Sequence, residues 1–370
     1  MSKRTAAGAK TLPGKYYTSE EVFQLENERI FSKNWLYAGR VSRLKKPCSY
    51  FLNEIDNESI IVSKDDKNRL HAFFNVCRHR GTRLCTETEG RFSKSIQCPY
   101  HAWTYSLNGK LLSAPNMQEV NSFDINDYPL HRVALAEWEG GIFINLSEGA
   151  APFEMVYVSL FEKFNQWQLS ELIPVHRIEY DVNANWKLIF QNYSECYHCP
   201  NLHPVLNRLT PYRASSNDLE EGPFLGGPMH LSDGNESLTM SGRACAKPLA
   251  CISRDDLQLI YYYTIFPNML LSLHPDYVLV HQLQRQGVGC TKIICEWLFH
   301  PDAVKQPDFD PNEAIEFWNM TNQQDWHICE LAQKGVQSQA YVPGPYAELE
   351  SMIAAFDRHY VKSLGNTKRE

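Results

Sequence analysis

The chain lacks the features that would assign it to several common protein classes. No apolar run is long enough to cross a bilayer, and the first residues, Met1 to Lys10, contain no apolar core of the kind that a secretory signal peptide needs. Basic residues are not in excess, since 36 Lys and Arg stand against 43 Asp and Glu, for a net charge of −7. A nucleic-acid surface needs a basic stripe. We therefore expect a cytoplasmic protein that binds neither membranes nor nucleic acids.

Repeat and nucleotide-binding signatures are missing as well. The sequence has no internal repeat and no low-complexity segment, and its Gly226-Gly227 pair belongs to no dinucleotide or phosphate-cradling motif. The 11 cysteines follow no regular framework, which is typical of free or metal-bound thiols in a reducing compartment. Because the sequence shows no dinucleotide-binding motif, electrons for any redox chemistry must come from a separate reductase.

Two short cysteine–histidine pairs are the most informative features that are present. One residue separates Cys77 from His79, and two residues separate Cys98 from His101. Together they offer two thiolates and two imidazoles. Such a set can hold a structural zinc ion. It can equally hold a Rieske 2Fe–2S cluster, in which two histidines replace two cysteines on one iron.

The residues around these pairs favour the iron–sulfur cluster. Their flanks are typical of β-strands, and Asn108-Gly109 predicts a type I′ hairpin turn. The stretch Cys-x-His-Arg-Gly … Cys-Pro-Tyr-His-x-Trp resembles the Rieske motif of ring-hydroxylating and related non-haem iron oxygenases. The resemblance implies that a 2Fe–2S cluster is bound by four residues: Cys77, His79, Cys98 and His101.

Hydrophobic patterning predicts an α+β protein with three parts. Residues 1–34 hold an N-terminal lead and a helix with a Thr18–Glu21 capping box, expected to pack with the catalytic domain. Residues 35–148 predict an all-β domain, because short apolar runs alternate with turn residues. Residues 149–370 mix strands and helices without βαβ alternation. Within them, 212–250 is rich in Gly, Ser and Pro and predicts a long loop.

A second group of ligand-type residues lies on a helix predicted from Asn185 to Leu202. Glu195 precedes His198 by three residues, and His203 follows it by five, with Pro200 between the histidines. Pro200 disrupts a regular helix, so that both imidazoles can converge on one ion. Two histidines and one carboxylate form the facial triad of non-haem Fe(II) oxygenases.

The third ligand must come from elsewhere, and Asp325 is the best candidate. At helical spacing Asp325 shares a stripe with four apolar residues, Trp318, Ile328, Cys329 and Ala332. A carboxylate is costly to bury there unless it is paired or metal-bound. The acids at 308–316 lie nearer the start of the helix, where they merely suit its dipole. An ordinary salt-bridge role for Asp325 stays open.

The pattern Glu-x-x-His-x-x-x-x-His-Pro again resembles the α subunit, or terminal oxygenase, of the Rieske non-haem iron oxygenases. The resemblance implies a Rieske β domain and a helix-grip (START/Bet v 1-like) catalytic domain with an antiparallel sheet. It implies mononuclear Fe(II) on His198, His203 and Asp325. Glu195 would link an iron-binding histidine to a cluster histidine of the neighbouring subunit in a homotrimer. Electrons would come from an NAD(P)H-dependent reductase with a flavin and its own iron–sulfur centre.

The acid at position 195 narrows the expected substrate. Most of these enzymes carry Asp there, and Glu is typical of the choline, carnitine and glycine betaine branch, which 192–200 and 341–346 also resemble. The branch implies oxidative N-demethylation or C–H hydroxylation of a quaternary amine. Seven aromatic residues are candidates for a cation-binding cage or simply for the core: Tyr261, Tyr262, Tyr263, Phe266, Tyr277, Phe317 and Trp318.

Three alternatives stay open at this point. The chain could be an aromatic-ring hydroxylating dioxygenase α subunit, a Rieske electron-transfer protein without oxygenase activity, or a zinc-stabilised binding protein. Further cysteines near the second site, Cys196, Cys199 and Cys329, are interpreted as small buried hydrophobic residues rather than as ligands.

Overall fold

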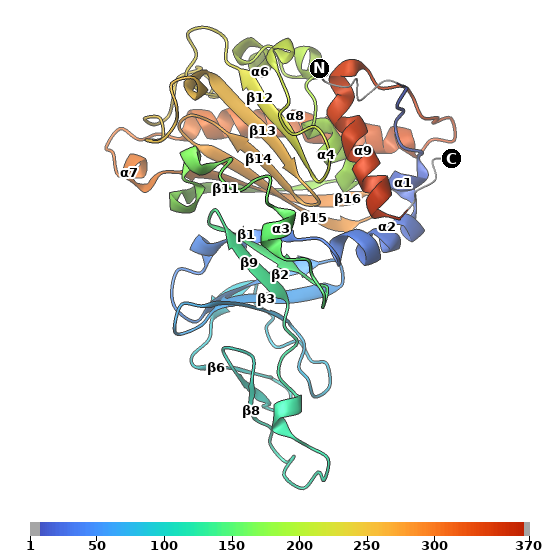
Figure 1. Ribbon diagram of the computed structural model, residues 1–370, viewed down its shortest axis with the longest axis vertical. Coiled ribbons are helices and arrows are strands. Elements are labelled where there is room, and N and C mark those ends of the chain that lie inside the picture. Colours follow the sequence, from blue (N-terminus) through green and yellow to red (C-terminus); the bar gives the residue numbers. More distant parts are fainter. Residues whose placement is uncertain (1–7, 366–370) are drawn as a thin grey trace. The chain divides into compact units, whose positions relative to one another are not determined.

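Figure 1 shows the computed structural model, which describes residues 8–365. The expected N-terminal lead lies partly outside these residues. The chain forms two compact units. One is Phe31–Met155, and the other joins the described residues up to Ile30 with those from Val156 onward.

The smaller unit is built mainly from short strands in three antiparallel sheets. Its strands are β1 (Leu36–Arg40), β2 (Ser49–Ile55), β3 (Glu58–Lys64), β4 (Leu70–Phe74), β5 (Glu89–Arg91), β6 (Ser95–Gln97), β7 (Thr104–Ser106), β8 (Leu111–Ser113), β9 (Ala134–Trp138) and β10 (Gly141–Asn145). The strand orders are β1-β10-β9, β4-β3-β2-β5 and β6-β7-β8. One cluster of buried side chains, which includes Cys77 and Cys98, joins the second and third sheets.

The turn between β7 and β8 is not the predicted type I′ turn. That turn needs a positive φ at both central residues, whereas Gly109 has φ +89° and Asn108 is not among the positive-φ residues. The Gly109 N–H donates to Ser106 O at 2.9 Å, so the loop is one residue longer and Gly109 takes the left-handed position after the turn. A Cβ at Gly109 would lie 2.5 Å from the ring of Phe73, which requires glycine here.

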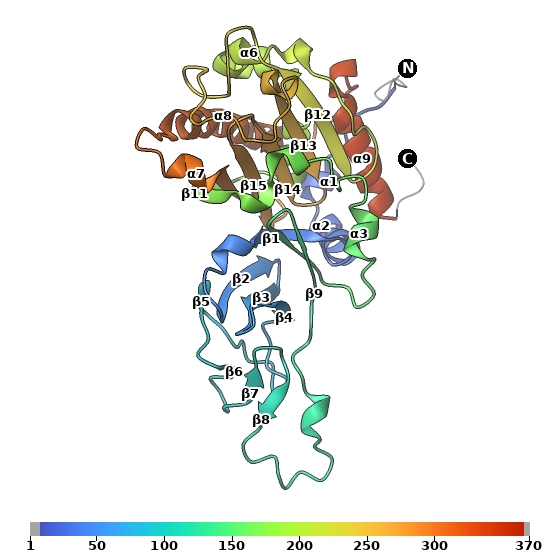
Figure 2. The same cartoon turned by 60° about the vertical axis from the view of Figure 1, so that its left-hand side comes forward.

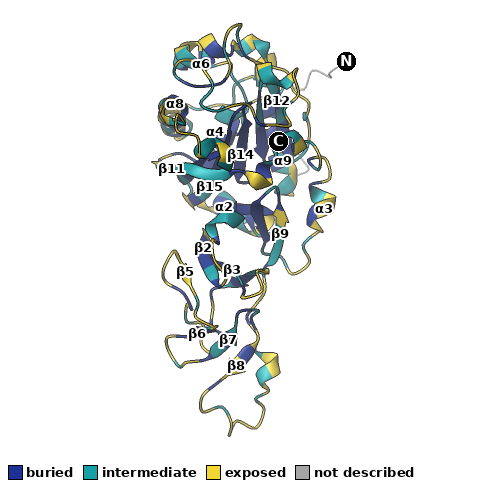
Figure 3. Cartoon of the chain, turned by 90° about the vertical axis from the view of Figure 1, so that its left-hand side faces the viewer, coloured by how far each residue is buried: buried dark blue, intermediate teal, exposed yellow. Residues whose placement is uncertain are grey.

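The larger unit is organised around one six-stranded antiparallel sheet. Its strands are β11 (Ile173–Val182), β12 (Phe224–His230), β13 (Leu259–Ile265), β14 (Met269–Leu273), β15 (Val278–Gly287) and β16 (Cys290–Phe299). They are ordered β11-β16-β15-β14-β13-β12. The central strand β14 is buried along its whole length, as Figure 3 shows. The predicted α+β class with an antiparallel sheet is confirmed.

Strand β12 lies inside the segment 212–250 that the composition predicted to be a loop. Its Gly-Gly-Pro sequence is typical of a turn, yet its whole length pairs with β13. Gly226 has φ +141°, and a Cβ there would lie 1.9 Å from the carbonyl oxygen of Tyr262. The glycine therefore permits a close approach of two strands instead of a turn.

Helices cover this sheet from segments far apart in the sequence. The α-helices of this unit are α1 (Lys15–Thr18), α2 (Glu20–Glu26), α4 (Trp186–Tyr193), α5 (Cys199–Leu202), α6 (Pro204–Leu209), α7 (Pro301–Val304), α8 (Asn312–Val336) and α9 (Ser351–Ser363), whereas most of α3 (Phe153–Val156) belongs to the smaller unit. Helix α4 packs between α8 and α9, and α9 lies beside β12 (Figure 2). Within residues 8–365, no helix combines the length and the apolar character needed to cross a bilayer.

The N-terminal helix begins one residue later than predicted. The Ser19 hydroxyl caps α2 by accepting the Val22 N–H at 3.3 Å. Thr18, predicted as the cap, ends α1 instead, and its hydroxyl donates to Gly14 O.

A buried group of charges ties α2 to α4 and β15. Glu26 accepts from Lys187 Nζ at 2.5 Å and from Arg285 at 3.1 Å, and no side chain of the three is more than 2% exposed. The Tyr360 hydroxyl of α9 also donates to Glu26, at 2.6 Å. The carboxylate is thus satisfied by groups from three separate elements, which fixes α4 and the residues that follow it.

Candidate metal centres

The two cysteine–histidine pairs lie on two similar loops of the smaller unit. The first loop follows β4, and the second follows β6. In each, the chain turns back on its cysteine, because the Cys77 N–H donates to Thr82 O at 2.9 Å and the Cys98 N–H donates to Trp103 O at 2.8 Å. The histidine of each pair lies within the turn so closed.

The cysteines are buried and the histidines face outward. Cys77 and Cys98 are 2% and 3% exposed, whereas His79 is exposed and His101 is half-buried. The two imidazole rings lie 4.8 Å apart. This donor set fits a Rieske cluster, in which Cys77 and Cys98 would hold one iron and His79 and His101 the other.

The surroundings of the two pairs favour the neutral, metal-binding form of the His79 imidazole. Burial, together with the charges of His101 and Arg80, lowers the pKa of His79, which keeps the imidazole in the neutral form that binds a metal. The Trp103 ring stacks on His79 with centroids 4.8 Å apart and holds its orientation. Burial raises the pKa of the Cys77 thiol, and a hydrogen bond with the Tyr105 hydroxyl at 3.3 Å partly offsets this effect.

The second group of ligand-type residues lies where α4 ends. The predicted continuous helix from Asn185 to Leu202 is wrong, because the chain leaves the helix at 194–198 before α5 begins. Pro200 is not the residue that breaks it. It lies in the first turn of α5, where backbone N–H groups have no acceptor within the helix, so a proline there breaks no hydrogen bond. Pro204 starts α6 in the same way.

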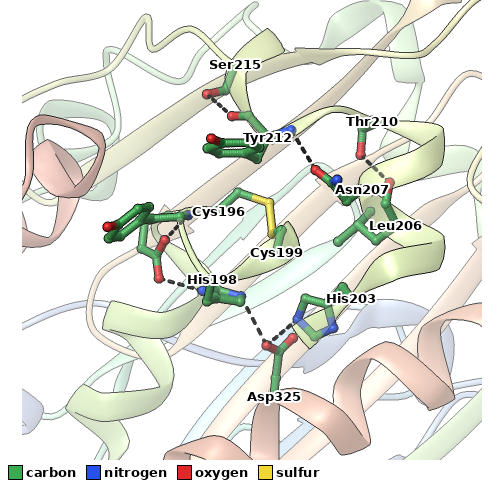
Figure 4. The surroundings of a disulfide bond; sticks show 12 residues. Cys196, His198, Cys199, His203, Leu206, Asn207, Thr210, Tyr212, Ser215 and Asp325 are labelled. Atoms are coloured by element: carbon green, nitrogen blue, oxygen red, sulfur yellow. Dashed lines mark hydrogen bonds and ion pairs between the residues drawn. A yellow bond between two sulfur atoms is a disulfide. The ribbon is translucent and has the colours of Figure 1, made fainter. Parts of the chain in front are cut away.

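These two short helices place both histidines on one ligand site. His198 is the N-cap residue of α5, and His203 lies between α5 and α6. Asp325 comes from the middle of α8. The ligand atoms of the three residues all lie within 4.8 Å of one another, and Figure 4 shows the side chains pointing toward a common point. The Asp325 Oδ1 atom lies 2.8 Å from His203 Nε2 and 3.5 Å from His198 Nε2.

The electrostatics of this site are those of an ion-binding cluster. Burial would raise the pKa of Asp325, but hydrogen bonds from His198 and His203 outweigh it and lower the pKa to about 2. Burial alone would lower the pKa of His198, whereas hydrogen bonds to Asp325 and Glu195 raise it to about 10. Two imidazoles and a carboxylate that compete for protons in this way are well suited to share one divalent cation.

Two further side chains orient the histidines from outside. Glu195 Oε1 lies 2.5 Å from His198 Nδ1, and Gln324 Oε1 lies 2.7 Å from His203 Nδ1. Glu195 and Gln324 are each hydrogen-bonded to the Nδ1 atom of a histidine, so that the Nε2 atom of that histidine points toward Asp325. The role of Gln324 was not predicted from the sequence, where its position next to Asp325 is the only signal.

The stripe predicted around Asp325 is partly wrong. Trp318 and Cys329 are buried as expected, but Ile328 is 37% exposed and Ala332 is exposed as well. The inner face of α8 instead carries polar residues such as Thr321. The helix therefore presents Asp325 at the border of its buried face, toward the histidines.

The three ligand-type residues line a cavity of about 850 Å³, counting its mouth. Of the seven aromatic residues considered for a cation cage, Tyr262 and Trp318 line this cavity. Tyr193, which sequence analysis missed although it lies two residues before Glu195, lines it as well. The Tyr262 ring lies 6.0 Å from Tyr193 and 6.2 Å from Trp318.

The interpretation of Cys196 and Cys199 as separate small hydrophobic residues is wrong. The two form a disulfide across His198, with Cα atoms 5.0 Å apart, and both line the cavity (Figure 4). Cys329 is a free, buried thiol, as expected. The sequence offered only the Cys-x-x-Cys spacing, which is equally typical of metal ligands and redox pairs.

The amino-acid sequence matches two models of protein families. Residues 34–124 match the Rieske [2Fe-2S] domain, and residues 169–366 match the catalytic domain of the ring-hydroxylating alpha subunit. The chain belongs to the Rieske ring-hydroxylating oxygenase family. The family predicted from the two motifs is confirmed, and with it a 2Fe–2S cluster and a mononuclear iron as cofactors of an oxygenase.

Individual relatives in the family carry quaternary-amine activities. The glycine betaine monooxygenase oxygenase subunit of Pseudomonas aeruginosa is 31% identical over 97% of this chain and 90% of its own. The carnitine monooxygenase oxygenase subunit of Acinetobacter baumannii is 38% identical over 53% of each chain.

Solved structures share the whole fold. The quaternary ammonium Rieske monooxygenase CntA superposes with a TM-score of 0.82 at 26% identity, over 96% of this chain and 95% of its own. Naphthalene 1,2-dioxygenase from Rhodococcus sp. shares the fold with a TM-score of 0.80 at 19% identity, over 97% of this chain and 95% of its own.

Proposed function

We propose that this oxygenase hydroxylates an N-methyl group of a small quaternary amine of the betaine, carnitine or choline type. Dioxygen, two electrons and two protons convert one N–CH3 group to N–CH2OH and release one water. The hydroxymethyl ammonium then loses formaldehyde and a proton and leaves a tertiary amine. The bound iron supplies the activation of dioxygen.

The observation that carries this proposal is an aromatic wall in the cavity of the ligand triad. Tyr193, Tyr262 and Trp318 present rings there, and aromatic faces attract quaternary ammonium groups by cation–π interaction. The Tyr262 hydroxyl is buried and has no hydrogen-bond partner among the described residues. The segment 215–217 adds neutral hydroxyl and amide groups to the lining, which suit the polar end of such a substrate.

The proposed residue roles follow from the two sites. Four residues bind the cluster: Cys77, His79, Cys98 and His101. The mononuclear iron is bound by His198, His203 and Asp325. A separate NAD(P)H-dependent flavin and iron–sulfur reductase supplies the electrons. Support for these roles comes from the donor sets and from the ligand-atom spacing of the triad.

We further propose a head-to-tail homotrimer in the cytoplasm, in which Glu195 links His198 to a cluster histidine of the neighbouring subunit. The Rieske domain would cover 35–148 and the iron domain 149–370, with 1–34 packed on the latter. The contact of Glu195 Oε1 with His198 Nδ1 supplies one half of such a link.

Substrate-dependent oxygen uptake tests the proposed reaction. The chain, loaded with iron and supplied with a compatible reductase, is given glycine betaine, carnitine, choline and aromatic acids. We expect uptake with a quaternary amine and release of about one formaldehyde per dioxygen. The matched control is the uncharged isostere of choline, in which a tert-butyl group replaces trimethylammonium. Coupled turnover of aromatic acids without formaldehyde, or equal turnover of the isostere, would contradict the proposal.

A further inference from the structure

The disulfide between Cys196 and Cys199 encloses His198, one of the proposed iron ligands. Only Tyr197 and His198 lie between the two cysteines, so the bond closes a small ring that contains the backbone of His198. Figure 4 shows the bond beside the His198 imidazole, in the same cavity as Asp325. A constraint on this ring therefore acts directly on the position of His198.

The ligand group is assembled in the state that carries this bond. His198 keeps Nδ1 at 2.5 Å from Glu195 and Nε2 at 3.5 Å from Asp325 while the two sulfurs are joined. His198 lies in the bend between α4 and α5, outside regular helix. Its carbonyl accepts from the N–H groups of Asn201 and Leu202, and the Cys199 N–H donates to Cys196 O at 3.1 Å across the same bend. A short cross-link removes conformational freedom from such a segment.

Small oxidants and reductants can reach the pair through Cys196. Cys196 is half-buried and the neighbouring Tyr197 is 55% exposed, whereas Cys199 is only 2% exposed; both cysteines line the cavity. The other nine cysteines are free, and three of them, Cys245, Cys251 and Cys290, are not buried, so the chain as a whole is not a disulfide scaffold. In the cytoplasm proposed above, an isolated pair of this kind is typical of redox-active thiols.

We propose that Cys196 and Cys199 are a reversible redox pair that controls how firmly the mononuclear iron is held. Oxidation by hydrogen peroxide joins the two thiols, and two S–H groups and one H2O2 give one S–S bond and two H2O. Exchange with an external dithiol reverses the step: the dithiol is oxidised to its own disulfide and the two S–H groups are restored. The disulfide form holds His198 in place, and the dithiol form releases it. This inference rests on the proposed role of His198 as an iron ligand.

Two measurements on the intact, iron-loaded chain test the pair. Alkylation of the unfolded protein before and after reduction, read by peptide mass, reports the state of the two thiols. The rate of iron loss to a chelator reports retention at the mononuclear site. We expect the pair to be protected from alkylation in the oxidised protein, and iron loss to be about tenfold faster after reduction with a phosphine.

Variants separate this effect from general damage. The double variant Cys196→Ser/Cys199→Ser should lose iron at the fast rate in either redox state, and Cys251→Ser, at an exposed free thiol, should respond to reduction as the wild type does. The Rieske absorption and EPR signals should stay unchanged in all of them, which shows that the cluster-bearing unit is intact. An unchanged Tm of the larger unit shows that each variant folds.

Two results would overturn the proposal: free thiols at both positions in the peroxide-treated protein, or equal rates of iron loss in the two redox states. A separate variant tests the assumption that His198 is an iron ligand. If His198→Ala retains mononuclear iron as well as the wild type, the proposed ligand role of His198 fails, whatever the state of the two cysteines.

Discussion

The Oδ1 atom of Asp325 lies 2.8 Å from Nε2 of His203, although the two residues are 122 positions apart in the sequence. The His203 side chain is 1% exposed, whereas those of Asp325 and His198 are 16% and 21% exposed. An ion bound here would be held by all three side chains, of which His203 is the most buried.

Removing the carboxylate should empty the mononuclear site. In Asp325→Ala the two imidazoles lose the anion that offsets the charge of a divalent cation, and only two protein ligands remain. We expect iron to fall from about three to about two atoms per chain, with the Rieske spectrum retained. Metal analysis with sulfide determination measures this. Glu330→Gln, on the same helix, is the control, and full occupancy in Asp325→Ala would assign the ligand to another residue.

The neighbouring amide should control how tightly the iron is bound. Gln324 Oε1 accepts a hydrogen bond from His203 Nδ1 at 2.7 Å, which keeps Nε2 unprotonated for the metal. Gln324→Leu should therefore weaken iron binding by about 10–100-fold in a chelator competition. The adjacent Gln323 is exposed and contacts Asn319 instead, so Gln323→Leu should bind iron as the wild type does. Equal affinities would show that Gln324 does not set the tautomer.

Residues within one motif could be predicted from the sequence, and contacts between distant segments could not. The spacing of Cys77 and His79, and of His198 and His203, is local, and it identifies the chemistry before any fold is known. Gln324 gains its role only because α8 meets the segment between α5 and α6, and Tyr193 only because α4 meets β13 and β14. No local pattern distinguishes these two residues from surface residues.

Two predictions about the backbone were wrong for a related reason. Pro200 was expected to break a helix and instead begins one, because the chain had already left the helix at 194–198. Strand β12 was missed because glycine serves a turn and a close strand pairing equally well, and only the approach of Gly226 to Tyr262 decides between them.

The negative charge of Glu195 should be dispensable for metal binding but not for electron delivery, because a glutamine there keeps an oxygen that can accept from His198. Its carboxylate contacts His198 Nδ1 and not the shared ligand position. In Glu195→Gln we expect about three iron atoms per chain, and product formed per NAD(P)H oxidised lower by at least about tenfold. The exposed Glu348 gives the control Glu348→Gln. Wild-type coupling in Glu195→Gln would contradict the link between subunits.

The buried Glu26 should stabilise the larger unit in a pH-dependent way. Burial would raise its pKa, but the charges of Lys187 and Arg285 outweigh burial and lower it. A depressed folded pKa gives stability that is present above the unfolded value near about 4.3 and is lost as the pH falls through the folded value. We expect Glu26→Gln to lower the free energy of unfolding by about 3–5 kcal/mol at pH 7, because two buried cations lose their anion.

Thermal unfolding at a series of pH values checks this. The difference in Tm between wild type and Glu26→Gln should shrink as the pH falls below about 4. Glu21→Gln, on the exposed side of the same helix, should change the free energy of unfolding by less than about 0.5 kcal/mol. A pH-independent difference would mean that lost packing, not lost charge, explains the effect.

The ring of Tyr262 should contribute to cation binding through its face. Tyr262 lines the cavity, whereas Tyr261 on the opposite face of β13 donates its hydroxyl to Asp256 outside it. A desolvated cation–π contact is worth about 1–2 kcal/mol, so Tyr262→Leu should raise KM for the preferred quaternary amine by roughly 5- to 30-fold. Tyr262→Phe keeps the ring and should stay within about threefold of the wild type, and Tyr261→Leu should leave KM unchanged. If the Phe variant is impaired as much as the Leu variant, the unpartnered hydroxyl of Tyr262, and not its ring, binds the substrate, and the cavity selects a hydrogen-bonding group in place of a cation.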